Sequence, residues 1–120
     1  MDIYNSVGWS NYTQNPDMLK QALDASLYTL YTYEGSELLG LVRAVGDGFS
    51  SVFIQDLLVK PDHQRKGIGK ALMEQVLITY SHAYRIQLAT EASEKNLDFY
   101  QSLGFQELKN LACTGMIYGK

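Results

Sequence analysis

The chain has 120 residues, of which 46% are hydrophobic and 19% are charged, and its formal net charge is −3. This is a globular composition, and we expect a single domain over residues 1–120. A negative net charge argues against a nucleic-acid or anionic-membrane binder, so neither partner is expected. One cysteine and two histidines leave no disulfide and no Cys/His cluster. No metal is therefore expected, and the absence of a signal-peptide pattern favours a cytoplasmic location.

The front of the chain predicts one helix followed by three strands. Asn15 is a good N-cap and Pro16 suits the first helical position, which predicts a helix over residues 16–25. Three runs rich in β-forming residues follow, at 27–33, 37–45 and 51–59. The third run is apolar enough for a central strand, and the charge of Asp56 within it needs either a partner or a function.

The rear of the chain predicts two helices and three further strands. Apolar residues at helical spacing favour a helix over residues 68–81, and a strand is expected at 85–90. Ser93 is a good N-cap and Gly104 a good helix stop, which predicts a short helix between them. The last strands are expected at 105–110 and 113–119, with Cys113 as a packed thiol. The strand–helix–strand order implies a parallel pair, so the fold class is α/β with a mixed sheet.

Positive charge and glycine gather just before the second helix. Four of the ten Lys and Arg residues lie close together there: Lys60, Arg65, Lys66 and Lys70. Gly67 and Gly69 stand at the expected helix start, where free amide N–H groups and the helix dipole favour anions. The loop therefore predicts a phosphate site.

Two well-known phosphate loops do not fit this stretch. A nucleoside-triphosphate loop of the Walker type needs glycine where Gln64 stands and Ser or Thr where Ala71 stands. The dinucleotide fingerprint needs a third glycine at the position of Leu72. A nucleotide-phosphate protein is thus a weak alternative.

Residues 64–69, Gln-Arg-Lys-Gly-Ile-Gly, resemble the Q/R-x-x-G-x-G/A loop of the GCN5-related N-acetyltransferases (GNAT). Residues 96–105, NLDFYQSLGF, resemble the A-x-x-F-Y-x-x-x-G-F segment of the same family. The order and spacing of the two motifs suit the helix–strand–helix between them, and the resemblance covers about residues 27–118. It implies a mixed, mostly antiparallel sheet flanked by helices, with a shortened N-terminus.

The resemblance also implies a reaction: acetyl transfer from acetyl-CoA, as co-substrate, to a small-molecule or peptide amine that attacks the thioester directly. An alternative is a non-catalytic acyl-CoA-binding module or partner subunit with the same fold. The net negative charge and the aromatic residues of the first third, Trp9 among them, suit a cationic or aromatic amine, and a protein lysine or N-terminus would also fit. The apolar C-terminal run TGMIYG is a candidate homodimer interface.

The resemblance implies roles for particular residues. The donor would be bound by the loop and by the preceding strand, where the sheet is expected to splay: Gln64, Arg65, Lys66, Gly67, Ile68, Gly69, Lys70, Leu57, Leu58 and Val59. Ser93 stands where the family usually has asparagine, and Asn96 follows it as a second contact to the donor. Tyr100 is the candidate general acid. Asp56 is the candidate general base, with a structural hydrogen bond as the alternative.

Overall fold

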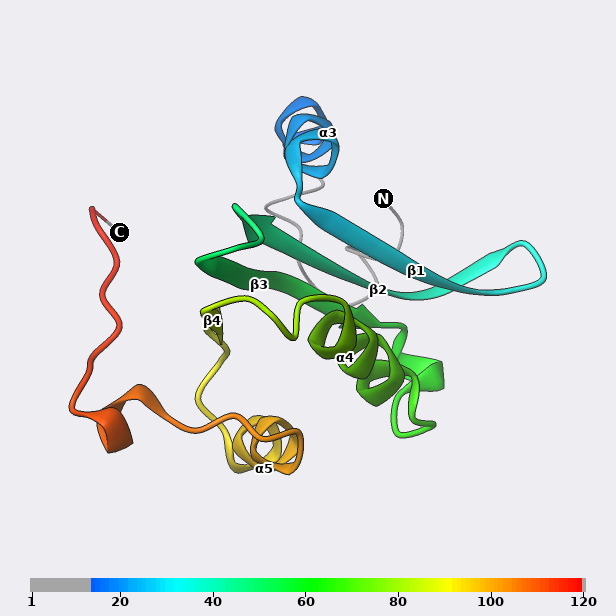
Figure 1. Cartoon of the computed structure of the whole chain (residues 1–120). Helices are drawn as coiled ribbons and strands as arrows, with labels where there is room; N and C mark the ends of the chain where they lie inside the picture. Colours follow the sequence, from blue (N-terminus) through cyan, green and yellow to red (C-terminus); the bar gives the residue numbers. More distant parts are fainter. Residues whose placement is uncertain (1–13, 120) are drawn as a thin grey trace. The chain divides into compact units, whose positions relative to one another are not determined.

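A four-stranded mixed sheet forms the centre of the fold in the computed structural model, which describes residues 14–119. The strands are adjacent in chain order: β1 (Tyr28–Glu34), β2 (Glu37–Gly46), β3 (Ser51–Val59) and β4 (Arg85–Leu88). The first two pairings are antiparallel and the β3–β4 pairing is parallel (Figure 1). The expected α/β class and the mixed, mostly antiparallel sheet are confirmed.

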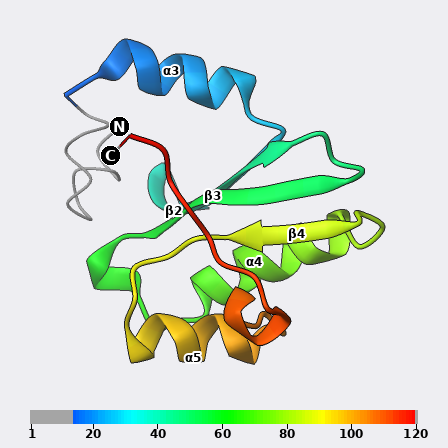
Figure 2. The same ribbon diagram turned by 90° about the vertical axis from the view of Figure 1, so that its left-hand side faces the viewer.

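Two helices cover opposite faces of this sheet. Leu19 of α3 (Pro16–Ala25) packs with Leu41 of β2 and Leu58 of β3, and all three are buried. Gly40, the neighbour of Leu41, faces α4 (Ile68–Thr79), and a Cβ there would lie only 3.2 Å from the Ile68 side chain. Because adjacent strand residues point to opposite faces, α3 and α4 enclose the sheet between them (Figure 2).

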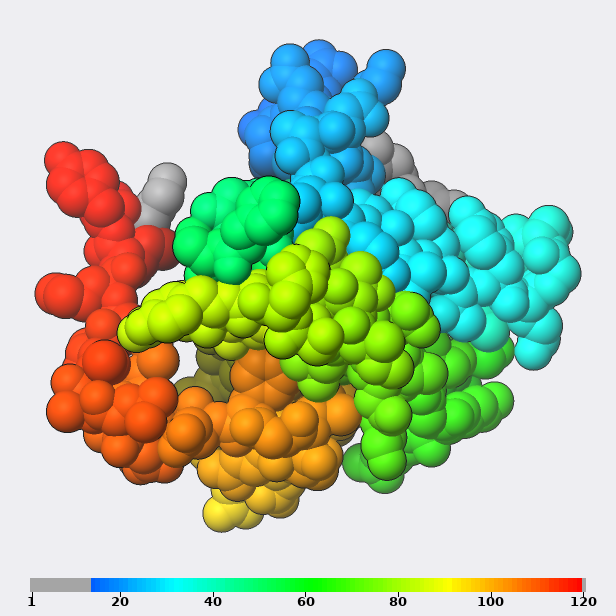
Figure 3. Space-filling model, viewed as in Figure 1, coloured from blue at the N-terminus to red at the C-terminus, as the bar shows by residue number. Residues whose placement is uncertain are grey.

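Asp47 fixes the turn from β2 into β3. Its Oδ1 accepts hydrogen bonds from the amides of Phe49 and Ser50 at 2.7 and 2.8 Å, and its Oδ2 accepts one from the Ser50 hydroxyl. These hydrogen bonds hold the pKa of the Asp47 carboxyl well below its usual range. The other turn of the meander, between β1 and β2 at Gly35, reaches the surface (in cyan, Figure 3).

The described chain forms two compact units, one ending at Leu88 and the other beginning at Ala89. The second unit contains α5 (Glu94–Ser102), which ends in a Schellman motif. Gly104 takes φ +101°, and the Phe105 amide donates to the Tyr100 carbonyl at 3.1 Å. The helix therefore ends where the sequence predicted.

The prediction of two strands after α5 is wrong. A short 3-10 helix, Leu108–Leu111, takes the place of the first, and residues 112–119 form neither helix nor strand. A strand needs a partner, and among the described residues only β1–β4 pair in a sheet. Met116, Ile117 and Tyr118 are 94%, 79% and 97% exposed. The prediction of a packed Cys113 is also wrong, because this residue is exposed.

Candidate active site

The loop between β3 and α4 turns sharply through two residues with positive φ. Arg65 has φ +66° and Gly67, the N-cap of α4, has φ +84°. Left-handed backbone is uncommon for a residue other than glycine, so the conformation of Arg65 marks this turn as a special feature. A Cβ added at Gly67 would meet nothing within 4 Å, which leaves the helix start open on that side.

The turn produces a row of backbone amides without acceptors. The first bond of α4 runs from the Ala71 amide to the Gly67 carbonyl at 3.0 Å, so the amides before Ala71 lie outside the helical ladder. From Arg65 to Lys70, none of them has a hydrogen-bond acceptor within residues 14–119. Six consecutive N–H groups at the positive end of a helix dipole can bind an anion.

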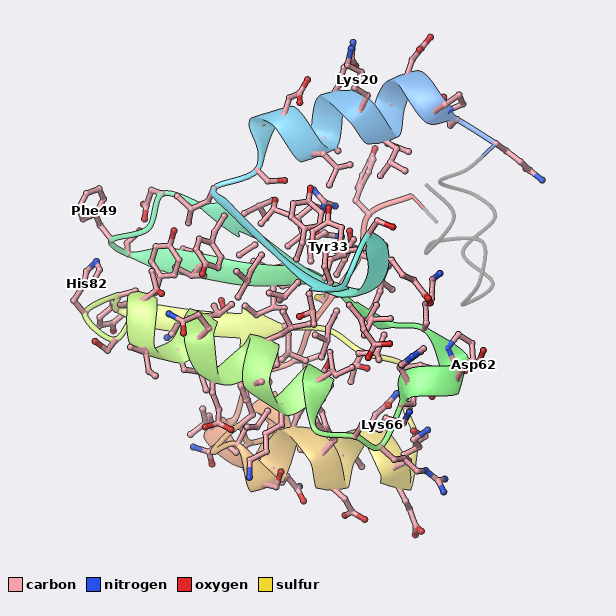
Figure 4. All side chains as sticks on the ribbon, turned by 90° about the vertical axis from the view of Figure 1, so that its right-hand side faces the viewer. Lys20, Tyr33, Phe49, Asp62, Lys66 and His82 are labelled. Carbon is pink, nitrogen blue, oxygen red and sulfur yellow. The ribbon has the colours of Figure 1, made fainter. Side chains whose placement is uncertain are left out.

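Cationic side chains surround these amides. Arg65, Lys66 and Lys70 are exposed, whereas Lys60 lies 3.6 Å from Glu37 and forms an ion pair with it. Figure 4 shows Lys66 at the same end of the sheet as Asp62, which belongs to the short helix Pro61–His63 of this loop. The loop therefore combines main-chain donors with three exposed positive charges, one fewer than the four gathered from the sequence, because Lys60 is paired with Glu37.

Gln64 holds the loop against the end of β3. Its Nε2 donates a hydrogen bond to the Val59 carbonyl at 3.1 Å. The side chain named from the sequence as a donor contact is thus used within the protein, where it fixes the distance between strand and loop.

The edge of β3 opens beside this loop. Parallel pairing with β4 ends at Ile54, opposite Leu88, although β3 continues to Val59. On the other side, the Lys60 amide donates to the Leu39 carbonyl at 2.8 Å. Polar groups alternate along an antiparallel pair, so those of Leu58 also point to β2, while those of Leu57 and Val59 point to the open edge.

Asp56, the candidate base, is buried beneath α3. Its Oδ2 accepts a hydrogen bond from Arg43 Nε at 2.7 Å, and none of its side-chain surface is exposed. This geometry favours the structural alternative. Arg43 was not predicted from the sequence, although its charge within the otherwise apolar run of residues 38–45, one strand away from Asp56, was a signal for the pair.

The second unit presents Tyr100 in an aromatic cluster. Its ring meets those of Phe99 and Phe105 edge to face, with centroids 5.0 and 5.9 Å apart. Burial raises the pKa of the Tyr100 phenol, and a hydrogen bond with Thr90 opposes that shift.

Ser93 and Asn96, the other residues of this unit predicted to contact the donor, hold the start of α5. The Ser93 Oγ accepts from the Asn96 amide at 3.1 Å, and the Asn96 side chain donates to the Glu91 carbonyl at 2.9 Å. The structure therefore brings the loop and the β3 edge together in one unit, and brings Tyr100, Ser93 and Asn96 together in the other.

Comparisons with known proteins agree with this geometry. Residues 3–117 match the model of a family described as an acetyltransferase (GNAT) domain, and the match spans both units. A solved GNAT-family acetyltransferase from Streptococcus pneumoniae TIGR4 is 49% identical with a TM-score of 0.90, covering 99% of this chain and 86% of that chain.

More distant relatives come from plants and algae. A Glycine max protein named histone acetyltransferase TAP1 is 34% identical over 88 residues, which are 68% of this chain and 38% of that protein. An uncharacterized N-acetyltransferase, ycf52, of Gracilaria tenuistipitata var. liui is 32% identical over 84% of this chain and 57% of its own length. The chain thus spans only part of these relatives. Within the described residues, no helix is long and apolar enough to cross a membrane. On the family match and the solved relative, the chain belongs to the GNAT acetyltransferase family.

Proposed function

We propose that this chain is an acetyl-CoA-dependent N-acetyltransferase that moves an acetyl group to a primary amine of a small molecule or peptide. One observation carries the proposal: six consecutive amides, Arg65 to Lys70, which have no acceptor within residues 14–119, lie in a cationic loop next to the open edge of β3. Coenzyme A offers both features a matching group, because it has a pyrophosphate and an arm containing amides. The acyl donor supplies a thioester that an amine can attack directly.

The loop would hold the pyrophosphate mainly by its main chain. Amide N–H groups at a helix start bind phosphate oxygens, and the exposed side chains of Arg65, Lys66 and Lys70 add attraction. Gln64 contributes indirectly by its bond to the Val59 carbonyl.

The open edge of β3 would hold the pantetheine arm by strand-like pairing. The polar groups available for this are those of Leu57 and the amide of Val59, because the Val59 carbonyl already accepts from Gln64. Leu58 contributes its side chain to the core instead.

Tyr100 would donate a proton to the departing thiolate, and the proton that the amine nitrogen loses on forming the amide would restore the phenol. A phenol of pKa about 10 or more remains protonated at neutral pH, and proton donation to a thiolate of pKa about 8.5 is uphill by a modest margin. The Thr90 hydrogen bond reduces that margin, because it lowers the pKa that burial raises. Ser93 and Asn96 hold the start of the same helix.

No dedicated base is included in the proposal. Asp56 is fully buried and bound to Arg43, so it lacks the access to an amine that a base requires. Roughly one alkylamine molecule in a thousand is uncharged at neutral pH, and positioning that molecule against the thioester supplies much of the acceleration.

The acceptor would be cationic in solution. Tyr31 and Tyr33 are 42% and 59% exposed on β1, with ring centroids 6.3 Å apart, and such faces attract an ammonium group. The name of the Glycine max relative points to a protein amine as one acceptor class. Homodimer formation stays a prediction. A cytoplasmic location also stays a prediction, since one Arabidopsis thaliana relative is named chloroplastic.

Two measurements on the full chain test the proposal. Calorimetry with CoA and acetyl-CoA should show binding, and thiol release with a panel of cationic and aromatic amines should show turnover. Binding without turnover on a broad panel would indicate the non-catalytic acyl-CoA-binding module. Absence of CoA binding at millimolar concentration would refute both functions.

A further inference from the structure

The ion pair of Arg43 with Asp56 lies where β3 parts from β4. Their side chains are 5% and 0% exposed. A buried pair of this kind adds little net stability compared with well-packed apolar residues, because both charges lose their hydration. Setting strand register or partner choice is the best-attested use of such pairs.

A β-bulge at Gln55 makes the pair possible. Arg43 lies opposite Asp56, but the next residue of β2, Ala44, lies opposite Ile54, so Gln55 is the extra residue of β3. Without the bulge, Asp56 would share a face with Ile54 and point to the α4 side of the sheet. Arg43 points to the α3 side, where its Nη1 also donates to the Ser26 hydroxyl at 3.2 Å just after α3. The two charges can meet only while the bulge is present.

The bulge in turn decides which main-chain groups of β3 are available. Pairing with β4 ends at Ile54, directly before the extra residue. A slip of β3 by one residue would remove the bulge and turn the polar groups of Leu57 and Val59 toward β2. It would also carry Asp56 away from Arg43 and leave a buried charge without its partner.

We propose that Arg43 and Asp56 are positioning residues for the acyl donor: their ion pair fixes the bulge at Gln55, and the bulge presents Leu57 and Val59 to the pantetheine arm. This inference rests on the proposed function, since it names residues that serve its donor site. Both residues lie outside the pyrophosphate loop, so we expect their effect to fall mainly on the arm and to reach the loop only through the Gln64 hydrogen bond to the Val59 carbonyl.

The test compares two ligands that differ by the arm. Calorimetry measures the Kd of coenzyme A and of its diphosphate half, 3′-phosphoadenosine 5′-diphosphate, which lacks only the pantetheine arm, for the parent, Asp56→Asn, Arg43→Met and Arg43→Met/Asp56→Leu. The double variant removes both charges and avoids an unpartnered buried ion. Leu23→Ala is the matched control, because Leu23 packs in the same layer under α3 but makes no contact that sets register.

We expect coenzyme A to bind the double variant about tenfold or more weakly, the loss of roughly two main-chain hydrogen bonds. The diphosphate half should keep its affinity within about twofold, and the KM for acetyl-CoA should rise while that for the amine stays near parental. Leu23→Ala should leave the ratio of the two affinities unchanged.

Parental coenzyme A affinity in the double variant would overturn the inference. An equal loss of affinity for both ligands would overturn the inference as well, because that result would show that the pair acts only through overall folding. If the parent itself binds the diphosphate half but gains nothing from the arm, the proposed donor site fails, and that result is distinct from a failure of the ion pair.

Discussion

Replacing Tyr100 with phenylalanine removes a single oxygen atom and keeps the ring. The edge-to-face contacts with Phe99 and Phe105 survive, and the hydrogen bond with Thr90 is lost. The cost in unfolding free energy is therefore that of one hydrogen bond, about 1 kcal/mol. A lost general acid costs more, about 3–5 kcal/mol of activation free energy, which lowers kcat at least about a hundredfold.

The pH dependence of thiol release separates the two effects. A general acid works while protonated, so its contribution is lost as the pH rises through its pKa. Burial raises the pKa of Tyr100, so the parent enzyme should keep this contribution up to about pH 10 and lose it above that. Stability should fall over the same alkaline range, because the folded state holds the phenolic proton more tightly than the unfolded chain does.

Thr90→Val is the matched control. It removes the same hydrogen bond but keeps the phenol, so its kcat at pH 7 should stay near parental and its alkaline loss should move to higher pH. Parental kcat in Tyr100→Phe across the whole pH range would refute the acid assignment.

Three further predictions concern the first unit. Gly67→Ala should cost about 1 kcal/mol in thermal unfolding, because the new Cβ meets no atoms but the residue must keep φ +84°. Lys66→Gln should weaken coenzyme A binding, measured by calorimetry, about two- to fivefold at low salt. The control Lys20→Gln, on the exposed face of α3, should not weaken it. Equal effects of the two variants would contradict a local charge contribution. Asp47→Ala should lower Tm at pH 7, and the difference from the parent should shrink as the pH falls below about 4, because the lowered pKa of Asp47 stabilises the fold only while the carboxylate is ionised.

Much of this fold could be predicted from local signals. Pro16 and the apolar spacing behind it predict a helix over 16–25, the range that α3 occupies. Gly104 predicts the end of α5, because it can adopt the positive φ of a Schellman motif without steric cost. The position of the loop before α4 could also be predicted, because the glycine in its sequence, Gly67, stands where the backbone takes a positive φ.

The remaining features depend on which distant segments meet. Residues 113–119 have the composition of a strand, but a strand forms only against a partner, and the composition does not supply one. The bulge at Gln55 depends on the pairing of β2 with β3, so the meeting of Arg43 and Asp56 could be suspected from two lone charges but not placed. The same pairing turns the main-chain polar groups of Leu58 toward β2. The sequence prediction named Leu57, Leu58 and Val59 together and could not tell which of them faces the open edge.

Recognition by amides rather than side chains has a consequence for sequence variation. A backbone N–H is present in every residue except proline, so residues 65–70 can change many side chains and keep their donors. A saturation scan of this segment that measures coenzyme A binding should find that most replacements keep binding and that proline abolishes it at every position. At position 67, only glycine and asparagine should bind nearly as well as the parent. The side chains of the loop would then be freer to change during evolution than the path of its backbone.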